Sequence, residues 1–302
     1  MKVFKSEAGR QQVWASYDQL VKQWGVKVEE SDLETSFGTT HIIRAGSRDL
    51  PPLLLFHGVG DNSALMWVYN ARELAEHFHL IAVDTIGGPG KSRPNERYKR
   101  QGMDHKLWFG ELLDGLGVEQ AYAAGVSMGC LLVQILLMAW PDRIKGIVGM
   151  AGLPAHPGLK SFSLKAMTVF LPEALFPTEN NTRKLLLKMS GANASVFTEN
   201  ELLMRHYGQL LRHSNKMAMA KHPRKRFTAE ETAILRDRAL FLVGDKDRIA
   251  YYPGCGQALE ELGIPHEILP DTGHGINHEQ AEKVNQSMIK NLRHFGAKIV
   301  SQ

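Results

Sequence analysis

Short hydrophobic runs recur along this chain, and most of them are separated by segments with the periodicity of a helix. Such runs are typical of strands that are buried on both faces of a parallel sheet. Their alternation with helices predicts an α/β fold, with a mostly parallel, doubly wound sheet of about eight strands and right-handed crossovers. The expected strands are 53–57, 80–84, 121–126, 144–150, 240–244 and 266–269, and the expected helices are 64–77, 103–116, 127–140, 253–262 and 279–295.

Before the first of these strands, residues 7–24 carry their large apolar side chains at the spacing of one helix face, and Gly25 ends the pattern. Two extended stretches follow at 27–37 and 39–45, joined at Gly38. This arrangement predicts an N-terminal amphipathic helix followed by an antiparallel hairpin.

One interval interrupts the alternation, because residues 156–238 show no clear strand and only helix-like segments such as 182–190 and 200–213. An interval of about 80 residues is too long for a plain connection. We therefore expect an α/β core formed by 1–155 and 239–302, with a helical cap subdomain at 156–238 inserted into it.

Composition excludes several classes of protein. Hydrophobic residues make up 43% of the chain and charged residues 23%, a balance that rules out a disordered chain, a collagen-like fibre and a coiled coil. The net charge of +4 is too small to indicate a nucleic-acid partner. The expected cap contains 14 Lys and Arg residues but only 7 Asp and Glu, so it carries an excess of positive charge. Its basic run 221–226 lacks interleaved aromatic residues and predicts a solvated face.

The cellular compartment is predicted from three features that the sequence lacks: a disulfide framework, a membrane span and a secretory signal. The two cysteines, Cys130 and Cys255, are too few for a disulfide framework or a cysteine-rich zinc site, which favours a reducing compartment. No apolar run approaches the roughly 20 residues that span a bilayer, and the first residues lack the apolar core of a secretory signal. We expect a cytoplasmic protein without a membrane partner.

The first candidate for chemistry is Ser127, at the centre of the pattern G-x-S-x-G between an expected strand and an expected helix. A serine on such a tight turn is held in a strained backbone conformation with its hydroxyl exposed, and the small flanking residues relieve crowding. The alternative interpretation is a serine that merely caps the helix. The pattern by itself does not decide between the two.

A serine nucleophile needs a base, and the base needs a carboxylate to orient it. Asp245 and Asp247 follow the expected strand 240–244, and His274 lies in a glycine-bracketed loop after the strand 266–269. Both loops are at carboxyl ends of strands, where open α/β sheets build their sites. Either aspartate is compatible with this placement.

A glycine-rich segment, His57-Gly58-Val59-Gly60, follows another expected strand. Such a bend can direct a backbone N–H toward a developing oxyanion, with the N–H of Met128 as its partner. An ordinary turn at the end of a strand is the alternative. His57 itself is expected to brace the backbone of the site through hydrogen bonds.

Together, the segments HGVG, AGVSMG, LVGDKD and TGHG resemble the α/β-hydrolase superfamily, and the N-terminal helix and hairpin resemble capped bacterial carboxylesterases. The resemblance implies an α/β-hydrolase fold in which Ser127 is the nucleophile, His274 the general base and acid, and Asp247, rather than Asp245, the orienting acid. It also implies an oxyanion hole formed by the backbone N–H groups of Val59 and Met128.

Three other features have plainer interpretations. Cys130, three residues after Ser127, is expected to be a packing residue. His278 lies four residues after His274, but no H-E-x-x-H pattern accompanies it, so we expect an exposed histidine and no metal ligand. The loop 84–92 ends in Gly-Lys-Ser like a phosphate-binding loop, but Thr85 stands where that motif requires glycine. We interpret it as a structural loop.

The resemblance implies a carboxylesterase that cleaves a small-molecule ester and needs no cofactor and no metal. The same triad would also serve hydrolysis of lactones, thioesters or carbon–carbon bonds, or perhydrolysis. A non-catalytic receptor for a small ligand with the same fold remains open as well. The sequence does not predict the oligomeric state.

Overall fold

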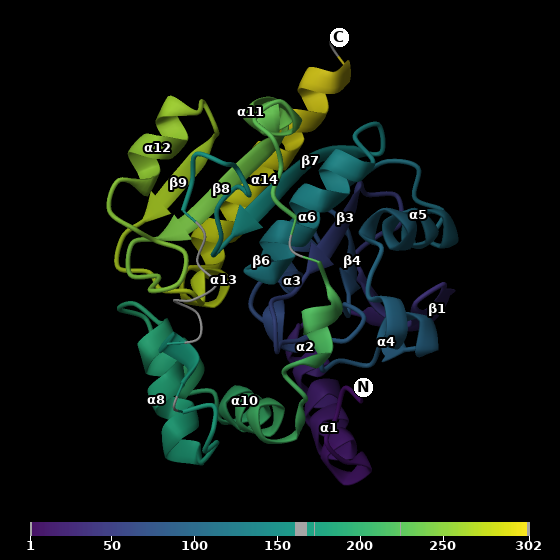
Figure 1. Ribbon diagram of the computed structural model, residues 1–302, viewed down its shortest axis with the longest axis vertical. Coiled ribbons are helices and arrows are strands. Elements are labelled where there is room, and N and C mark those ends of the chain that lie inside the picture. Colours follow the sequence, from purple (N-terminus) through teal and green to yellow (C-terminus); the bar gives the residue numbers. More distant parts are fainter. Residues whose placement is uncertain (1, 161–167, 172, 224, 301–302) are drawn as a thin grey trace.

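The computed structural model describes residues 2–160, 168–171, 173–223 and 225–300, so parts of the expected cap lie outside the described residues. The described chain forms one sheet of nine strands in the order β1-β2-β4-β3-β6-β7-β8-β9, with β5 beside β2 (Figure 1). The strands are β1 (Val28–Thr35), β2 (Gly38–Ala45), β3 (Pro52–Phe56), β4 (His79–Val83), β5 (Arg93–Pro94), β6 (Ala121–Val126), β7 (Ile144–Met150), β8 (Ala239–Gly244) and β9 (His266–Leu269).

The expected fold class is confirmed. The first hairpin, β1 with β2, is antiparallel, β2 also pairs antiparallel with β4 and β5, and all other pairs are parallel. Every residue of β4, β6 and β8 is buried, as continuous apolar runs require when helices cover both faces of a sheet. The short strand β5 was not predicted.

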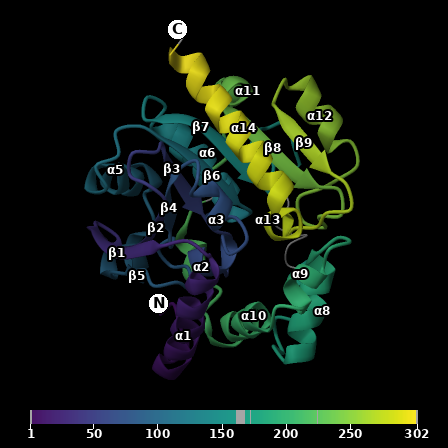
Figure 2. The same ribbon diagram turned by 180° about the vertical axis from the view of Figure 1, so that it is seen from behind.

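Helices cover both faces of this sheet, as Figures 1 and 2 show from opposite sides. Side chains from one group of helices pack with one face of the sheet, and side chains from a second group pack with the other. The first group is α4 (Glu96–Gln101), α5 (His105–Gly115), α6 (Met128–Ala139), α11 (Leu235–Arg238) and α12 (Cys255–Glu261); the second includes α1 (Glu7–Gln23), α2 (Ser63–Met66), α3 (Ala71–Leu74), α13 (Ile276–Glu279) and α14 (Ala281–Val300).

Two expected helices are each divided in the structure. The segment 64–77 forms the separate short helices α2 and α3, and the segment 279–295 belongs to α13 and α14. At the first break Asn70 is fully buried, and its amide donates to the Asn277 carbonyl at 3.1 Å and to Asn285 Oδ1 at 2.9 Å. These tertiary hydrogen bonds link the two broken segments, and periodicity alone cannot reveal them.

Between β7 and β8 lies the part of the chain that we call the insertion, residues 151–238. Its described residues contain helices and the isolated bridge residue Ser214, but no named strand. Figure 1 shows α8 beyond the ends of β8 and β9, and α10 between α8 and α1. The named helices of the insertion before α11 are α8 (Glu179–Met189), α9 (Ser195–Thr198), α10 (Glu201–His213), η1 (Ala218–Lys221) and η2 (Glu231–Ile234).

The N-terminal helix α1 packs against α10 of the insertion, a contact that the sequence did not predict. A buried hydrogen bond of 2.6 Å joins Ser16 Oγ to His206 Nδ1. On the other side of the ring, Asn62 Nδ2 lies 3.0 Å from His206 Nε2, and Asn62 also caps α2. Burial lowers the pKa of His206 to about 3, so its ring is neutral at physiological pH. The insertion is thus fixed to both α1 and the loop after β3.

None of the helices in the described part of the chain is both long enough and hydrophobic enough to cross a membrane.

Candidate active site

Ser127 occupies the turn between β6 and α6 with φ 57° and ψ −112°. Residues other than glycine seldom adopt a positive φ, and holding one there costs about 1–3 kcal/mol. The two glycines of the motif make the turn sterically feasible. A Cβ on Gly125 would lie 2.2 Å from the Gly129 carbonyl oxygen, and a Cβ on Gly129 would lie 2.2 Å from the Phe56 carbonyl oxygen. Any side chain at these two positions would therefore push β6, α6 and β3 apart.

The glycine-rich loop after β3 lies directly over this turn, because a Cβ added to Gly58 would be only 3.3 Å from the Ser127 Cβ. His57 holds the loop in place. The Thr85 N–H donates to His57 Nε2 at 2.9 Å, which leaves the proton on Nδ1 to bond the Gly58 carbonyl at 2.8 Å. Burial lowers the pKa of His57 and keeps its ring neutral. His57 therefore braces the backbone as expected from the sequence.

The proposed oxyanion donors belong to the two segments that meet at the serine. Met128 is the first residue of α6, and Val59 lies in the loop after β3 with 51% of its surface exposed. Within the described part of the chain, neither backbone N–H has a protein acceptor. Two N–H groups without an acceptor beside a partly exposed turn are what an anion-binding position requires.

Asp247 and His274 form a buried pair. His274 Nδ1 lies 2.9 Å from Asp247 Oδ2, while Asp247 Oδ1 accepts the N–H groups of Ile249 at 2.8 Å and Ala250 at 3.0 Å. Burial raises the pKa of Asp247, but the His274 charge and these hydrogen bonds lower it by more than burial raises it. The net pKa is below the usual value, so the carboxyl is ionised at neutral pH. Asp245 does not contact the histidine and instead lies 3.4 Å from the Lys246 ammonium.

The environment of His274 favours its protonated form. Burial alone lowers the pKa of the ring, but the Asp247 carboxylate raises it more, and the result lies above the usual 6.5. This is the electrostatic arrangement that stabilises an imidazolium during proton transfer.

Ser127 and His274 form no hydrogen bond among the described residues. Ser127 follows β6 and His274 follows β9, and β7 and β8 lie between these two strands, so the carboxyl ends of β6 and β9 are about 14 Å apart. In structures without substrate, catalytic hydrogen bonds are often long and tighten only in the complex.

The His274 loop is attached to the insertion, which the sequence did not predict. The His274 N–H donates to the Met189 carbonyl at 2.6 Å, at the end of α8. The Glu279 carboxylate accepts the Gly191 N–H at 2.6 Å with one oxygen and the Gly273 N–H at 3.0 Å with the other. Glu279 lies on α13, so it connects the insertion to the residue before His274. Because Gly191 is 88 residues from Glu279, no local sequence pattern indicates this role.

Two of the secondary expectations are settled by burial. Cys130 is buried against Gly149 and Gly152, and burial raises the pKa of its thiol to about 12, in keeping with a packing residue. The expectation that His278 is exposed was wrong. His278 is 3% exposed, and its Nε2 donates to the Leu65 carbonyl at 3.0 Å. No cluster of three His, Cys, Asp or Glu side chains arranged to hold a metal occurs in the described ranges.

The loop 84–92 is fixed by Asp84. One oxygen of this buried carboxylate accepts the Lys91 N–H at 2.7 Å and the Tyr17 hydroxyl at 3.0 Å, and the other accepts the Ser63 N–H at 2.9 Å. A Cβ on Gly90 would collide with this carboxylate at 2.1 Å. An anionic side chain against the Gly-Lys-Ser segment is opposite to what a phosphate site needs, which agrees with a structural loop.

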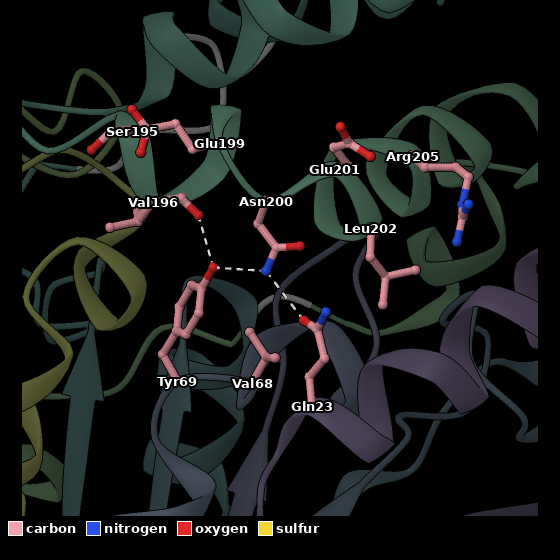
Figure 3. A pocket seen from close by; sticks show the side chains of 10 residues that line it. All are labelled: Gln23, Val68, Tyr69, Ser195, Val196, Glu199, Asn200, Glu201, Leu202 and Arg205. Carbon is pink, nitrogen blue, oxygen red and sulfur yellow. Dashed lines mark hydrogen bonds between the residues drawn. The ribbon is translucent and has the colours of Figure 1, made fainter.

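A separate cavity of about 820 Å³ opens between α1, α9 and α10. Figure 3 shows a chain of hydrogen bonds across it. Tyr69 donates to the Val196 carbonyl at 2.8 Å, and the Asn200 amide donates both to the Tyr69 hydroxyl at 3.0 Å and to Gln23 Oε1 at 3.1 Å. None of the proposed catalytic residues lines this cavity.

Comparison with known proteins places this arrangement in a family. Residues 51–281 match the family described as alpha/beta hydrolase fold, and this match includes most of the chain. The chain belongs to that family. The matched range begins just before β3 and ends at the start of α14, so it contains the Ser127 turn, Asp247 and His274.

Among the members, carboxylesterases of Bacillus subtilis are similar over nearly the whole chain. The sequence is 26% identical over 295 residues to carboxylesterase YbfK of strain 168, covering 92% of this chain and 93% of that protein. The crystal structure of naproxen esterase, carboxylesterase NP, has a TM-score of 0.78 at 25% identity, covering 95% of this chain and 99% of that one. BphD, the 2-hydroxy-6-oxo-6-phenylhexa-2,4-dienoate hydrolase of Rhodococcus sp. strain RHA1, has a TM-score of 0.70 at 20% identity, covering 89% and 99%, and shares the fold.

Proposed function

We propose that this protein is a serine hydrolase that cleaves carboxylic esters through an acyl-enzyme intermediate. The observation that carries the proposal is the buried Asp247–His274 pair, joined at 2.9 Å, at the same edge of the sheet as a serine held at positive φ. The full-length similarity to carboxylesterases supports the ester bond as the target. The insertion acts as the cap of this site.

In the proposed mechanism, His274 Nε2 removes the proton of Ser127 as the hydroxyl oxygen attacks the ester carbonyl. Asp247 fixes the tautomer with the proton on Nδ1 and stabilises the imidazolium that forms. The N–H groups of Val59 and Met128 bind the oxyanion of the tetrahedral intermediate. His274 then protonates the leaving alcohol, and the same ring activates the water that releases the acid.

The experiment is hydrolysis of 4-nitrophenyl acetate by purified Ser127→Ala and His274→Ala variants. Each substitution is expected to lower kcat by several orders of magnitude, since each removes a group that acts only in the transition state. Circular dichroism checks that each variant is folded. Near-parental turnover by the Ser127→Ala variant would refute the proposal.

A further inference from the structure

Asp61 is a carboxylate at the proposed site that the mechanism does not use. It follows the loop after β3, and its Oδ2 lies 3.8 Å from the position of a Cβ added to Gly58. The Ser127 Cβ lies 3.3 Å from the same position. The Asp61 carboxylate and the side chain of the proposed nucleophile therefore both lie beside Gly58, in the glycine-rich loop after β3.

The second carboxylate oxygen, Asp61 Oδ1, is fully buried and has no hydrogen-bond donor among the described residues. Two other buried carboxylates near the site are satisfied, whereas Asp245 Oδ1 also lacks a donor among the described residues. Asp84 accepts hydrogen bonds from three groups, and Asp247 from the His274 ring and two backbone N–H groups. Leaving a buried acceptor without a donor is unfavourable, and such groups are rare in native structures unless they have a role.

The surroundings of Asp61 place it between the catalytic histidine and the insertion. Burial raises the pKa of Asp61 to about 7, and the positive charge of His274 opposes this rise. On the insertion side, burial and then the charge of Asp61 raise the pKa of Tyr207 on α10. Neither His274 nor Tyr207 donates a hydrogen bond to Asp61 in the described structure. None of the described residues supplies the missing donor.

We infer that Asp61 is a specificity residue that accepts a hydrogen bond from a donor group, a hydroxyl or an ammonium, that the substrate carries close to its scissile ester. This inference rests on the proposed function, because it places the ester carbonyl at Ser127. A carbonyl carbon bonded to Ser127 Oγ would leave carbons two or three bonds away on the acyl or alcohol side beside Asp61. Substrates that lack the donor would bury the carboxylate without a partner.

A site that hydrogen-bonds a substrate group discriminates strongly against the analogue that lacks it, because a polar group then stays unpaired. A hydrogen bond to a charged group corresponds to about 10- to 100-fold in kcat/KM. We therefore expect the donor-bearing ester to be preferred over its simple counterpart by at least tenfold. Asp61 supplies this preference, so removing its carboxylate is expected to bring the ratio close to 1.

The experiment measures kcat/KM by pH-stat titration for methyl butanoate, methyl 3-hydroxybutanoate, methyl 3-aminobutanoate and 2-hydroxyethyl butanoate. Methyl butanoate carries no donor. The 3-hydroxy and 3-amino esters place a hydroxyl and an ammonium on the acyl side, and the 2-hydroxyethyl ester places a hydroxyl on the alcohol side. For the parental protein, at least one donor-bearing ester is expected to exceed methyl butanoate tenfold or more. In the Asp61→Ala variant that ratio is expected to fall below threefold.

Two further variants separate the sources of the effect. Asp61→Asn keeps an acceptor oxygen without charge, so it is expected to retain part of a hydroxyl preference and to lose an ammonium preference. Asp49→Ala removes an exposed carboxylate elsewhere and is expected to leave the ratios unchanged. Labelling of Ser127 by a fluorophosphonate shows that each variant retains a folded site.

The inference would be overturned if the parental protein hydrolysed all four esters with similar kcat/KM, or if Asp61→Ala changed every ester by the same factor. Both results leave the proposed function intact as long as Ser127→Ala abolishes turnover. Failure of the parental protein to hydrolyse any ester, with no fluorophosphonate labelling, would instead refute the proposed function.

Discussion

Replacing Asp247 with asparagine tests how the carboxylate controls His274. The amide oxygen of asparagine is able to keep the hydrogen bonds from the Ile249 and Ala250 N–H groups, which are 2.8 Å and 3.0 Å long. Its NH₂ group then faces His274 Nδ1, where the carboxylate oxygen was at 2.9 Å. Because NH₂ only donates, the histidine proton moves to Nε2, and the ring no longer accepts the proton of Ser127.

The expected loss in kcat is about ten-thousand-fold, or about 5.4 kcal/mol in the activation free energy. Stability should change little, because the backbone hydrogen bonds remain. The assay is steady-state hydrolysis of 4-nitrophenyl acetate, and Asp245→Asn is the matched control, expected to stay within about threefold of the parental rate because Asp245 faces Lys246. The reasoning would be refuted if Asp247→Asn kept more than a tenth of parental kcat, or if Asp245→Asn showed the larger loss.

Three other predictions follow from the same contacts. Since His274 acts as a neutral base and its pKa lies above 6.5, kcat/KM should fall as the pH drops, with a midpoint above 6.5; a midpoint below 6 would contradict this. Ser127→Gly relieves the strain of a positive φ and should raise the free energy of unfolding in urea by up to about 2 kcal/mol, whereas Ser127→Ala should not; equal values would contradict it. Glu279→Gln leaves the N–H of Gly191 or Gly273 without an acceptor and should lower the free energy of unfolding by about 1–3 kcal/mol, and an unchanged urea midpoint would argue against it.

The sequence predicted the sheet well where local pattern determines structure. The bounds of β6, β7 and β9 agree with the expected runs 121–126, 144–150 and 266–269. These strands are short and mostly apolar, and they end at turns, so local sequence pattern is sufficient to place them. The breaks between α2 and α3 and between α13 and α14 depend on buried asparagine contacts between distant segments, which periodicity does not report.

The candidate site divides in the same way. Ser127, Asp247 and His274 became candidates because each lies in a loop after a strand, and strand ends of a parallel sheet meet at one edge. Glu279 and Asp61 were not among the candidates, because the contacts of Glu279 are distant in sequence and the role proposed for Asp61 depends on a missing donor. The expectation that His278 is exposed was wrong for the same reason, since its ring bonds the Leu65 carbonyl of α2, which is distant in sequence.

The central claim is that Ser127 is the nucleophile, and covalent labelling tests it most directly. The protein would be incubated with a fluorophosphonate, digested, and mapped by mass spectrometry, with turnover of 4-nitrophenyl esters measured in parallel. Our account predicts one label per chain, on Ser127, with loss of turnover in proportion to labelling. Ester turnover that persists while Ser127 is fully labelled, or a label on a different residue, would contradict it.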